Sequence, residues 1–212
     1  MKLDEVTDLG YAVAIPLPTD AELSKDSAAI LAASPPINVL RMFAGTGDMF
    51  PALLAMVKAV FYDKEIEPRL REVIVLRCAH LLDCPYEWQA NMVMAPNAGV
   101  TAQEIAAVGA DGPVESADPA IRRICKATDE LTRDATLQDA TLAELIAAHG
   151  PRLASKYILA MAWFNLLSRS STPRASRSRP PASSRGAPRR SSACPGKSLP
   201  SGSTRGWEPV FR

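Results

Sequence analysis

The chain lacks the features that mark membrane-spanning and secreted proteins. None of its apolar runs reaches the ~18 residues that a helix needs to cross a bilayer, and its start, MKLDEVTDLGYAV, does not have the pattern of a signal peptide. Its four cysteines are irregularly spaced, which argues against a disulfide framework and favours reduced thiols. We therefore expect a cytoplasmic protein that acts away from membranes.

Histidine is scarce, and glycine-rich phosphate loops are missing from the sequence. The two histidines, His80 and His149, do not form a cluster with metal-ligand spacing, so no metal is predicted. Without a glycine-rich loop to hold phosphates, no nucleotide cofactor is predicted either. The sequence thus predicts a protein that needs no cofactor.

The formal net charge of +1 conceals two unequal parts of the chain. Residues 1–167 carry a net charge of −8, whereas residues 168–212 carry +9. An acidic body gives no reason to predict nucleic acid as the partner of the first part.

Helical periodicity is the main pattern that the chain does show. Apolar residues recur every three to four positions in MFPALLAMVKAVFY and PRLASKYILAMAWFNLLSR, and no stretch alternates as a strand would. Hydrophobic residues make up 47% of the chain, enough for a buried core. We predict an all-α domain over residues 19–168, preceded by an extended arm over residues 1–18. Helix boundaries are expected at Thr19, Glu67-Pro68, Thr101, Asp118-Pro119 and His149-Gly150.

The composition changes abruptly after residue 168. Residues 169–212 are mostly Ser, Arg, Pro, Ala and Gly, which cannot bury a core. One interpretation is a basic, disordered tail that contacts anionic partners. Another is a disrupted reading frame, because a GC-rich gene read out of frame yields these residues and the change falls within an apolar helix. An intact frame on resequencing independent isolates would exclude the second interpretation.

The segment CPYEWQAN, residues 84–91, carries the side chains that most resemble a site. Pro85 fits the first turn of a helix, which makes Cys84 its N-cap. At 100° per residue, four side chains share one stripe of that helix: Cys84, Glu87, Trp88 and Asn91. Glu72 belongs to the preceding helix, so a carboxylate from that helix is expected to face the stripe.

This part of the chain also resembles a known family. RLREVIVLRCAHLLDCPYEWQANMVMAPNAGVTAQEIAAV, residues 69–108, is similar to the carboxymuconolactone decarboxylase family, whose all-helical fold is shared with alkylhydroperoxidase D-like proteins. The redox branch of that family carries Glu, eleven residues, then Cys-x-x-Cys-x-x-x-His. Glu72 and Cys84 match this pattern, while Glu87 replaces the second Cys and Asn91 replaces the His. The Tyr86-Glu87-Trp88 run resembles the non-redox members, and the whole resemblance covers residues 40–167.

The resemblance implies a homo-oligomer, commonly a trimer or hexamer, that acts on a small molecule. Our first hypothesis is a cofactor-independent enzyme for a small organic acid or lactone, in which Glu72 and Glu87 transfer protons. Cys84, Trp88 and Asn91 would shape its pocket. The second is a thiol peroxidase of the alkylhydroperoxidase or peroxiredoxin type that uses Cys84. The third is a non-catalytic helical scaffold that merely keeps the fold.

Each carboxylate also has a purely structural interpretation. Glu87 in an apolar cleft would have a raised pKa, which suits a general acid or base. As the third residue of a helix capped by Cys84, it would instead accept a hydrogen bond from the Cys84 N–H. Glu72 would either complete a pair of carboxylates or pair with an arginine of its own helix: Arg69, Arg71 or Arg77.

Two opposing influences act on the Cys84 thiol. A helix N-terminus favours the thiolate by about 0.3–1 kcal/mol. A carboxylate at ~4 Å disfavours it by roughly 4 kcal/mol at an effective dielectric constant of ~20, so Glu87 is expected to keep Cys84 protonated or to take up a proton itself. Cys84 is otherwise a small buried apolar residue.

Two further residues bear on the same site. His80 is a candidate to reach the pocket in place of the histidine that Asn91 replaces. Cys78 is a poor resolving thiol for Cys84, because six helical positions amount to ~9 Å of rise, and the sequence does not place Cys125.

Overall fold

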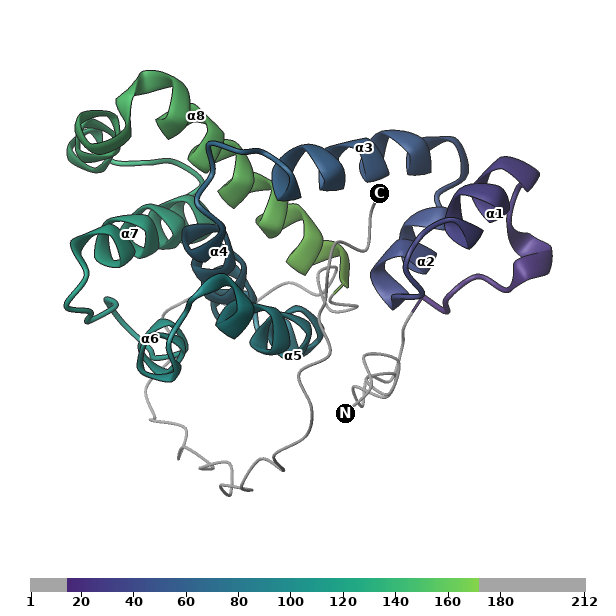
Figure 1. The fold of residues 1–212 in the computed structure, drawn as a ribbon, viewed down its shortest axis with the longest axis horizontal. Coiled ribbons are helices and arrows are strands. Elements are labelled where there is room, and N and C mark those ends of the chain that lie inside the picture. The colour runs from purple at the N-terminus through teal and green to yellow at the C-terminus, as the bar shows by residue number, and fades with distance from the viewer. Residues whose placement is uncertain (1–14, 172–212) are drawn as a thin grey trace, which may run out of the picture.

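The computed structural model describes residues 15–171, and every regular element in that range is a helix (Figure 1). The predicted all-α fold class is confirmed for this part of the chain. Residues 1–14 of the predicted arm, and residues 172–212 of the predicted tail with Cys194, lie outside the described residues.

The α-helices are α1 (Lys25–Ala32), α2 (Asn38–Ala44), α3 (Phe50–Phe61), α4 (Pro68–Leu81), α5 (Pro85–Met94), α6 (Ala102–Val108), α7 (Pro119–Asp134) and α8 (Asp139–Ser171). The 3₁₀ helices are η2 (Asp20–Glu22), η3 (Gly47–Met49) and η4 (Ala95–Ala98).

Helix α4 forms the centre of the body. It packs against α5, α6, α7 and α8, and Figure 1 shows it between α7 and α8. Pro68 occupies its first turn, where the missing N–H costs nothing. Residues 73–76 are buried in succession, as expected of a helix that is surrounded on all sides. This position carries Glu72 into the protein interior.

Of the three N-terminal helices, α2 and α3 contact α8, and α1 packs on α2 and α3. Figure 1 shows α1, α2 and α3 extending from one side of the body. Two aromatic pairs join α2 and α3 to α8. The ring centroids of Phe43 and Trp163 are 6.3 Å apart, and those of Phe61 and Phe164 are 5.8 Å apart in an edge-to-face arrangement. The Tyr86 hydroxyl accepts a hydrogen bond from the Val39 N–H at 3.1 Å and so joins α2 to α5.

The predicted helix boundaries are confirmed at most positions. Thr101 and Glu104 form the reciprocal cap of α6, and Asp118 caps α7. Gly150 has φ 74° and ψ 161°, so it divides α8 into two helical parts at the predicted point. The prediction at Thr19 is wrong in extent: Thr19 caps only η2, and α1 begins after Ser24, whose side chain accepts the Ser27 N–H.

A single arginine holds the centre of the fold together. The Arg77 side chain is 0% exposed and makes two hydrogen bonds to the Asp129 carboxylate, at 2.5 and 2.7 Å. It also donates to the carbonyls of Val108 (2.8 Å), Ala110 (2.7 Å) and Gly112 (2.6 Å). One side chain thereby joins α4 to α7 and fixes the loop after α6. Arg77 is consequently not the partner of Glu72.

Removing the Asp129 carboxylate should strongly destabilise the protein. Asp129→Ala leaves the Arg77 charge buried without a counter-ion, which costs about 3–5 kcal/mol. Arg152→Ala is the control, because Arg152 is 79% exposed and its pair with Glu65 at 3.2 Å should be worth at most about 1 kcal/mol. Urea unfolding measures both free energies of unfolding. Equal losses would show that the Arg77 network does not hold the fold.

Candidate carboxylate site between α4 and α5

The turn between α4 and α5 brings the two predicted carboxylates into one region. Asp83 has φ 52°, a left-handed conformation that reverses the chain direction. The Cys84 N–H then donates to the Ala79 carbonyl at 2.9 Å, which fixes the start of α5 against the end of α4. Because α4 and α5 pack together, side chains of α5 reach the buried part of α4.

Glu87 is buried and accepts hydrogen bonds from two side chains. It is 6% exposed, and its Oε2 lies 3.4 Å from Asn91 Nδ2, which also donates to the Glu87 main-chain carbonyl at 2.7 Å. The hydroxyl of Ser171, at the end of α8, donates to Glu87 Oε1 at 3.5 Å. The Cys84 N–H is already paired with Ala79, which contradicts the interpretation of Glu87 as a helix cap.

The environment of Glu87 favours its protonated form. Burial is the main cause that raises its pKa, and the charge of Glu72 raises it further. The hydrogen bonds from Asn91 and Ser171 act in the opposite direction, and the resulting pKa is about 7. Near neutral pH, comparable amounts of the acid and the carboxylate are therefore present.

Glu72 is even more deeply buried and has one partner. It is 1% exposed, and its Oε1 accepts hydrogen bonds from Arg71 Nε and Nη2, both at 3.2 Å. Its Oε2 is buried and accepts no hydrogen bond from the residues that the structure describes. Burial raises the Glu72 pKa, and the Arg71 charge counteracts this rise. Arg69, the remaining candidate partner, pairs with Glu104 and Asp118 instead.

Cys84 lies in a largely apolar setting at the N-terminus of α5. It is buried in a small cluster with Ala79 and Tyr86, against which Trp88 packs. Burial raises the Tyr86 pKa to about 12, and the charges of Glu87 and Cys84 contribute to this rise. Cys84 and Glu87 are thus both close enough to Tyr86, at the start of α5, to act on it electrostatically.

His80 and Trp88 make their contacts toward the end of α6. His80 Nε2 lies 3.3 Å from a carboxylate oxygen of Asp111, and the His80 and Trp88 rings are 6.3 Å apart. The Trp88 ring packs so closely on Gly109 that a Cβ there would lie 2.6 Å from Trp88 Cη2. The contacts of these two side chains therefore differ from those of Glu87 and Asn91, although all four come from the α4–α5 pair.

Ser171 is the member of this site that sequence reasoning missed. It lies beyond residue 168, in the segment whose composition indicates a tail. The one available signal is helical spacing, because Phe164, Leu167 and Ser168 are buried and Ser171 continues the same face. Tyr86 lies outside the predicted stripe, yet its hydroxyl binds the main chain of α2.

The other described cysteines are buried thiols without reactive character. Burial raises the pKa of both Cys78 and Cys125 to about 12. Asn165 Nδ2 donates to Cys78 Sγ at 3.5 Å, which fixes that thiol inside the core. Neither is suited to resolve an oxidised Cys84 near neutral pH.

Within residues 15–171, no group of three or more His, Cys, Asp or Glu side chains is placed to hold a metal ion. In the same range, none of the helices combines the length and apolar character that crossing a membrane requires.

Part of the chain matches a family of known proteins. A sequence model of the carboxymuconolactone decarboxylase family matches residues 47–130. This segment contains α3 to α6 and most of α7, with Glu72, Cys84, Glu87 and Asn91. The match confirms the resemblance seen in the sequence over these residues. No curated protein matches the chain.

The raised Glu87 pKa should make stability depend on pH in a defined direction. The native state binds the Glu87 proton more tightly than the unfolded chain, whose Glu pKa is near the ordinary 4.5. Protonation of Glu87 therefore adds roughly 3 kcal/mol to the free energy of unfolding below pH 4.5. This contribution is lost as the pH rises to about 7. Glu87→Gln should remove this slope, as urea unfolding at a series of pH values would measure.

The control for this experiment is Glu115→Gln, because Glu115 is exposed. The Glu115→Gln protein should keep the wild-type slope between pH 4.5 and about 7. If Glu87→Gln and Glu115→Gln behaved alike, Glu87 would titrate as an ordinary surface carboxylate.

Proposed function

We propose that this protein is a cofactor-independent enzyme that performs acid–base chemistry on a small organic acid or lactone. The observation that carries the proposal is the buried Glu87 carboxyl group, whose pKa is raised to about 7 beside the buried Glu72. A general acid works best when its pKa lies near the working pH. The family match supports a decarboxylase-like reaction.

The two carboxylates have different tasks in this proposal. In this proposal Glu72 is the anionic partner of Arg71, and its negative charge favours the proton on Glu87. Decarboxylation breaks the bond between the substrate carbon and its carboxylate, and the electron pair left behind forms an enolate with the neighbouring carbonyl. Glu87 gives its proton to that carbon and becomes a carboxylate. Water then returns a proton to Glu87, which the repulsion from Glu72 favours.

The neighbouring groups position the acid and stabilise the developing charge. Asn91 cannot move a proton as a histidine would, and in this proposal its amide holds Glu87 Oε2 in place. The N–H groups of the first turn of α5 have no carbonyl partners within the helix and would stabilise the enolate oxygen. Cys84 and Trp88 line the substrate space at the start of α5.

The peroxidase alternative depends on a thiolate at Cys84. Cys84 is 2% exposed, which restricts the access of a peroxide and of a reducing thiol to its sulfur. Slow alkylation of Cys84 near pH 7 would support the acid–base proposal, and rapid alkylation would favour the peroxidase.

The assembly and location remain proposals from the family resemblance. We propose a cytoplasmic homo-oligomer, a trimer or hexamer. Leu159 and Leu166, two turns apart on α8, are 54% and 41% exposed and give a second copy an apolar surface to cover. A monomer in sedimentation experiments would contradict this proposal.

Loss of the Glu87 acid should abolish turnover while the fold is kept. Glu87→Gln preserves size and hydrogen bonding but removes the proton, so kcat should fall by about 10²–10⁴. Cys84→Ala should retain much of the activity, because the thiol only shapes the pocket. The assay follows the decarboxylation of carboxymuconolactone by the wild type and each variant.

Glu115→Gln is the matched control and should leave kcat unchanged, because this exposed carboxylate lies away from the α4–α5 pair. Equal kcat for the wild type and Glu87→Gln would rule out Glu87 as the acid. Loss of activity in Cys84→Ala alone would favour the thiol chemistry, and no turnover by the wild type would favour the scaffold.

A further inference from the structure

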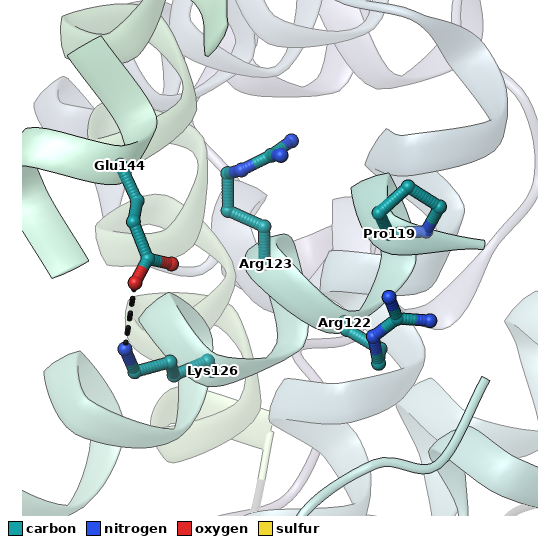
Figure 2. A pocket seen from close by; sticks show the side chains of 5 residues that line it. All are labelled: Pro119, Arg122, Arg123, Lys126 and Glu144. Atoms are coloured by element: carbon teal, nitrogen blue, oxygen red, sulfur yellow. Dashed lines mark hydrogen bonds and ion pairs between the residues drawn. The ribbon is translucent and has the colours of Figure 1, made fainter. Parts of the chain in front are cut away.

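A cleft away from the carboxylate site lies between α7 and the first part of α8. It has a volume of about 340 Å³ and is lined by Pro119, Arg122, Arg123, Lys126 and Glu144 (Figure 2). None of these residues belongs to the Glu72–Glu87 region. Clefts of this size are typical of small-molecule sites.

The lining of the cleft has an excess of positive charge. Three cationic side chains meet one carboxylate, and Figure 2 shows that carboxylate, Glu144, in contact with Lys126. The Lys126 Nζ to Glu144 Oε1 distance is 3.3 Å, so this pair is neutral as a unit. The charges of Arg122 and Arg123 remain, which gives the cleft a net charge of +2.

The two arginines keep hydrogen-bonding capacity for a ligand. Arg122 uses one N–H group on the Ser116 carbonyl. Arg123 forms no hydrogen bond or ion pair with any residue that the structure describes, and Figure 2 shows its side chain rising from α7 between Glu144 and Pro119. A guanidinium presents a fork of donors that matches an oxyanion.

This concentration of charge is unfavourable without a counter-ion. Glu144 offsets the charge of Lys126, but the lining offers no second carboxylate to offset the charges of Arg122 and Arg123. The N-terminal end of α7 adds the positive end of a helix dipole. An anion in the cleft would relieve both effects. The cleft is thus a positive site within a part of the chain, residues 1–167, whose net charge is −8.

We propose that this cleft binds a small dianion, either a phosphate monoester or a dicarboxylate. The ligand charge of −2 matches the net charge of the lining. The lining has no aromatic side chain on which a base could stack, so a small polar metabolite fits better than a nucleotide. Arg123 is the main contact, because its guanidinium is uncommitted.

The test is titration of the full chain with inorganic phosphate and, separately, with succinate, followed by amide NMR shifts. Saturable shifts in α7 and the first part of α8 are expected. Arg123→Gln should weaken binding at least tenfold, because it removes the free guanidinium. Glu144→Gln should tighten binding several-fold, because it removes the one negative charge from the cleft. The ligand that saturates the site at the lower concentration, phosphate or succinate, has the chemistry that the site prefers.

Lys58→Gln on α3 is the control, because it removes an exposed positive charge outside the cleft. It should leave the affinity unchanged. A loss of affinity in Arg123→Gln but not in Lys58→Gln assigns the binding to the cleft and not to the nine arginines of residues 168–212. Unfolding midpoints without ligand verify that each variant is folded, and Arg122→Gln provides a second weakened variant. Equal affinities for Arg123→Gln, Lys58→Gln and the wild type would overturn the proposal. Shifts confined to residues outside α7 and α8 would do the same.

Discussion

Two buried carboxyl groups, of which only Glu72 has an arginine as its counter-ion, are the constraint on which this site depends. Removing a carboxylate from water costs several kcal/mol unless it is paired. Arg71 meets that requirement for Glu72 through two hydrogen bonds. The side chains that donate to Glu87, Asn91 and Ser171, are neutral. Glu87 therefore lowers the cost of its burial by binding a proton. The fold thereby creates a weak acid where the chain would otherwise carry an anion.

The rest of the described fold keeps these two groups inside. The Arg77–Asp129 network fixes α4 against α7 and the loop after α6, and so holds the helix that carries Glu72. At the other end of α4, the hydrogen bond from the Cys84 N–H to Ala79 sets where α5 begins. The last turn of α8 brings Ser171 to Glu87. The first two contacts hold the helices that carry Glu72 and Glu87, and the third reaches the Glu87 carboxyl group itself.

Much of the helical framework can be predicted from the sequence, because caps and apolar spacing are local signals. Asp118, Thr101 and Gly150 mark helix ends through their own backbone preferences, and the structure follows them. Thr19 misleads because Ser24 offers a second cap five residues later. The choice between two good caps depends on packing that the local sequence does not encode.

The site is less predictable, because it depends on pairings between distant side chains. Helical spacing places Glu87 and Asn91 on one stripe, and the structure joins them by a hydrogen bond. Spacing does not reveal that Arg77 is committed to Asp129, which leaves Arg71 for Glu72. Composition also obscures Ser171, since a serine at the edge of a Ser- and Arg-rich segment gives no sign of contact with a buried acid. The roles of these residues remain predictions that rest on their geometry.

The most direct measurement is a carbon-13 NMR titration of the glutamate side-chain carboxyls, with the Glu87 signal assigned by its loss in Glu87→Gln. The account predicts one carboxyl that titrates near pH 7, well above the exposed glutamates. A Glu87 midpoint at or below the ordinary value of 4.5 would show that the group is an anion at neutral pH and would contradict its role as an acid.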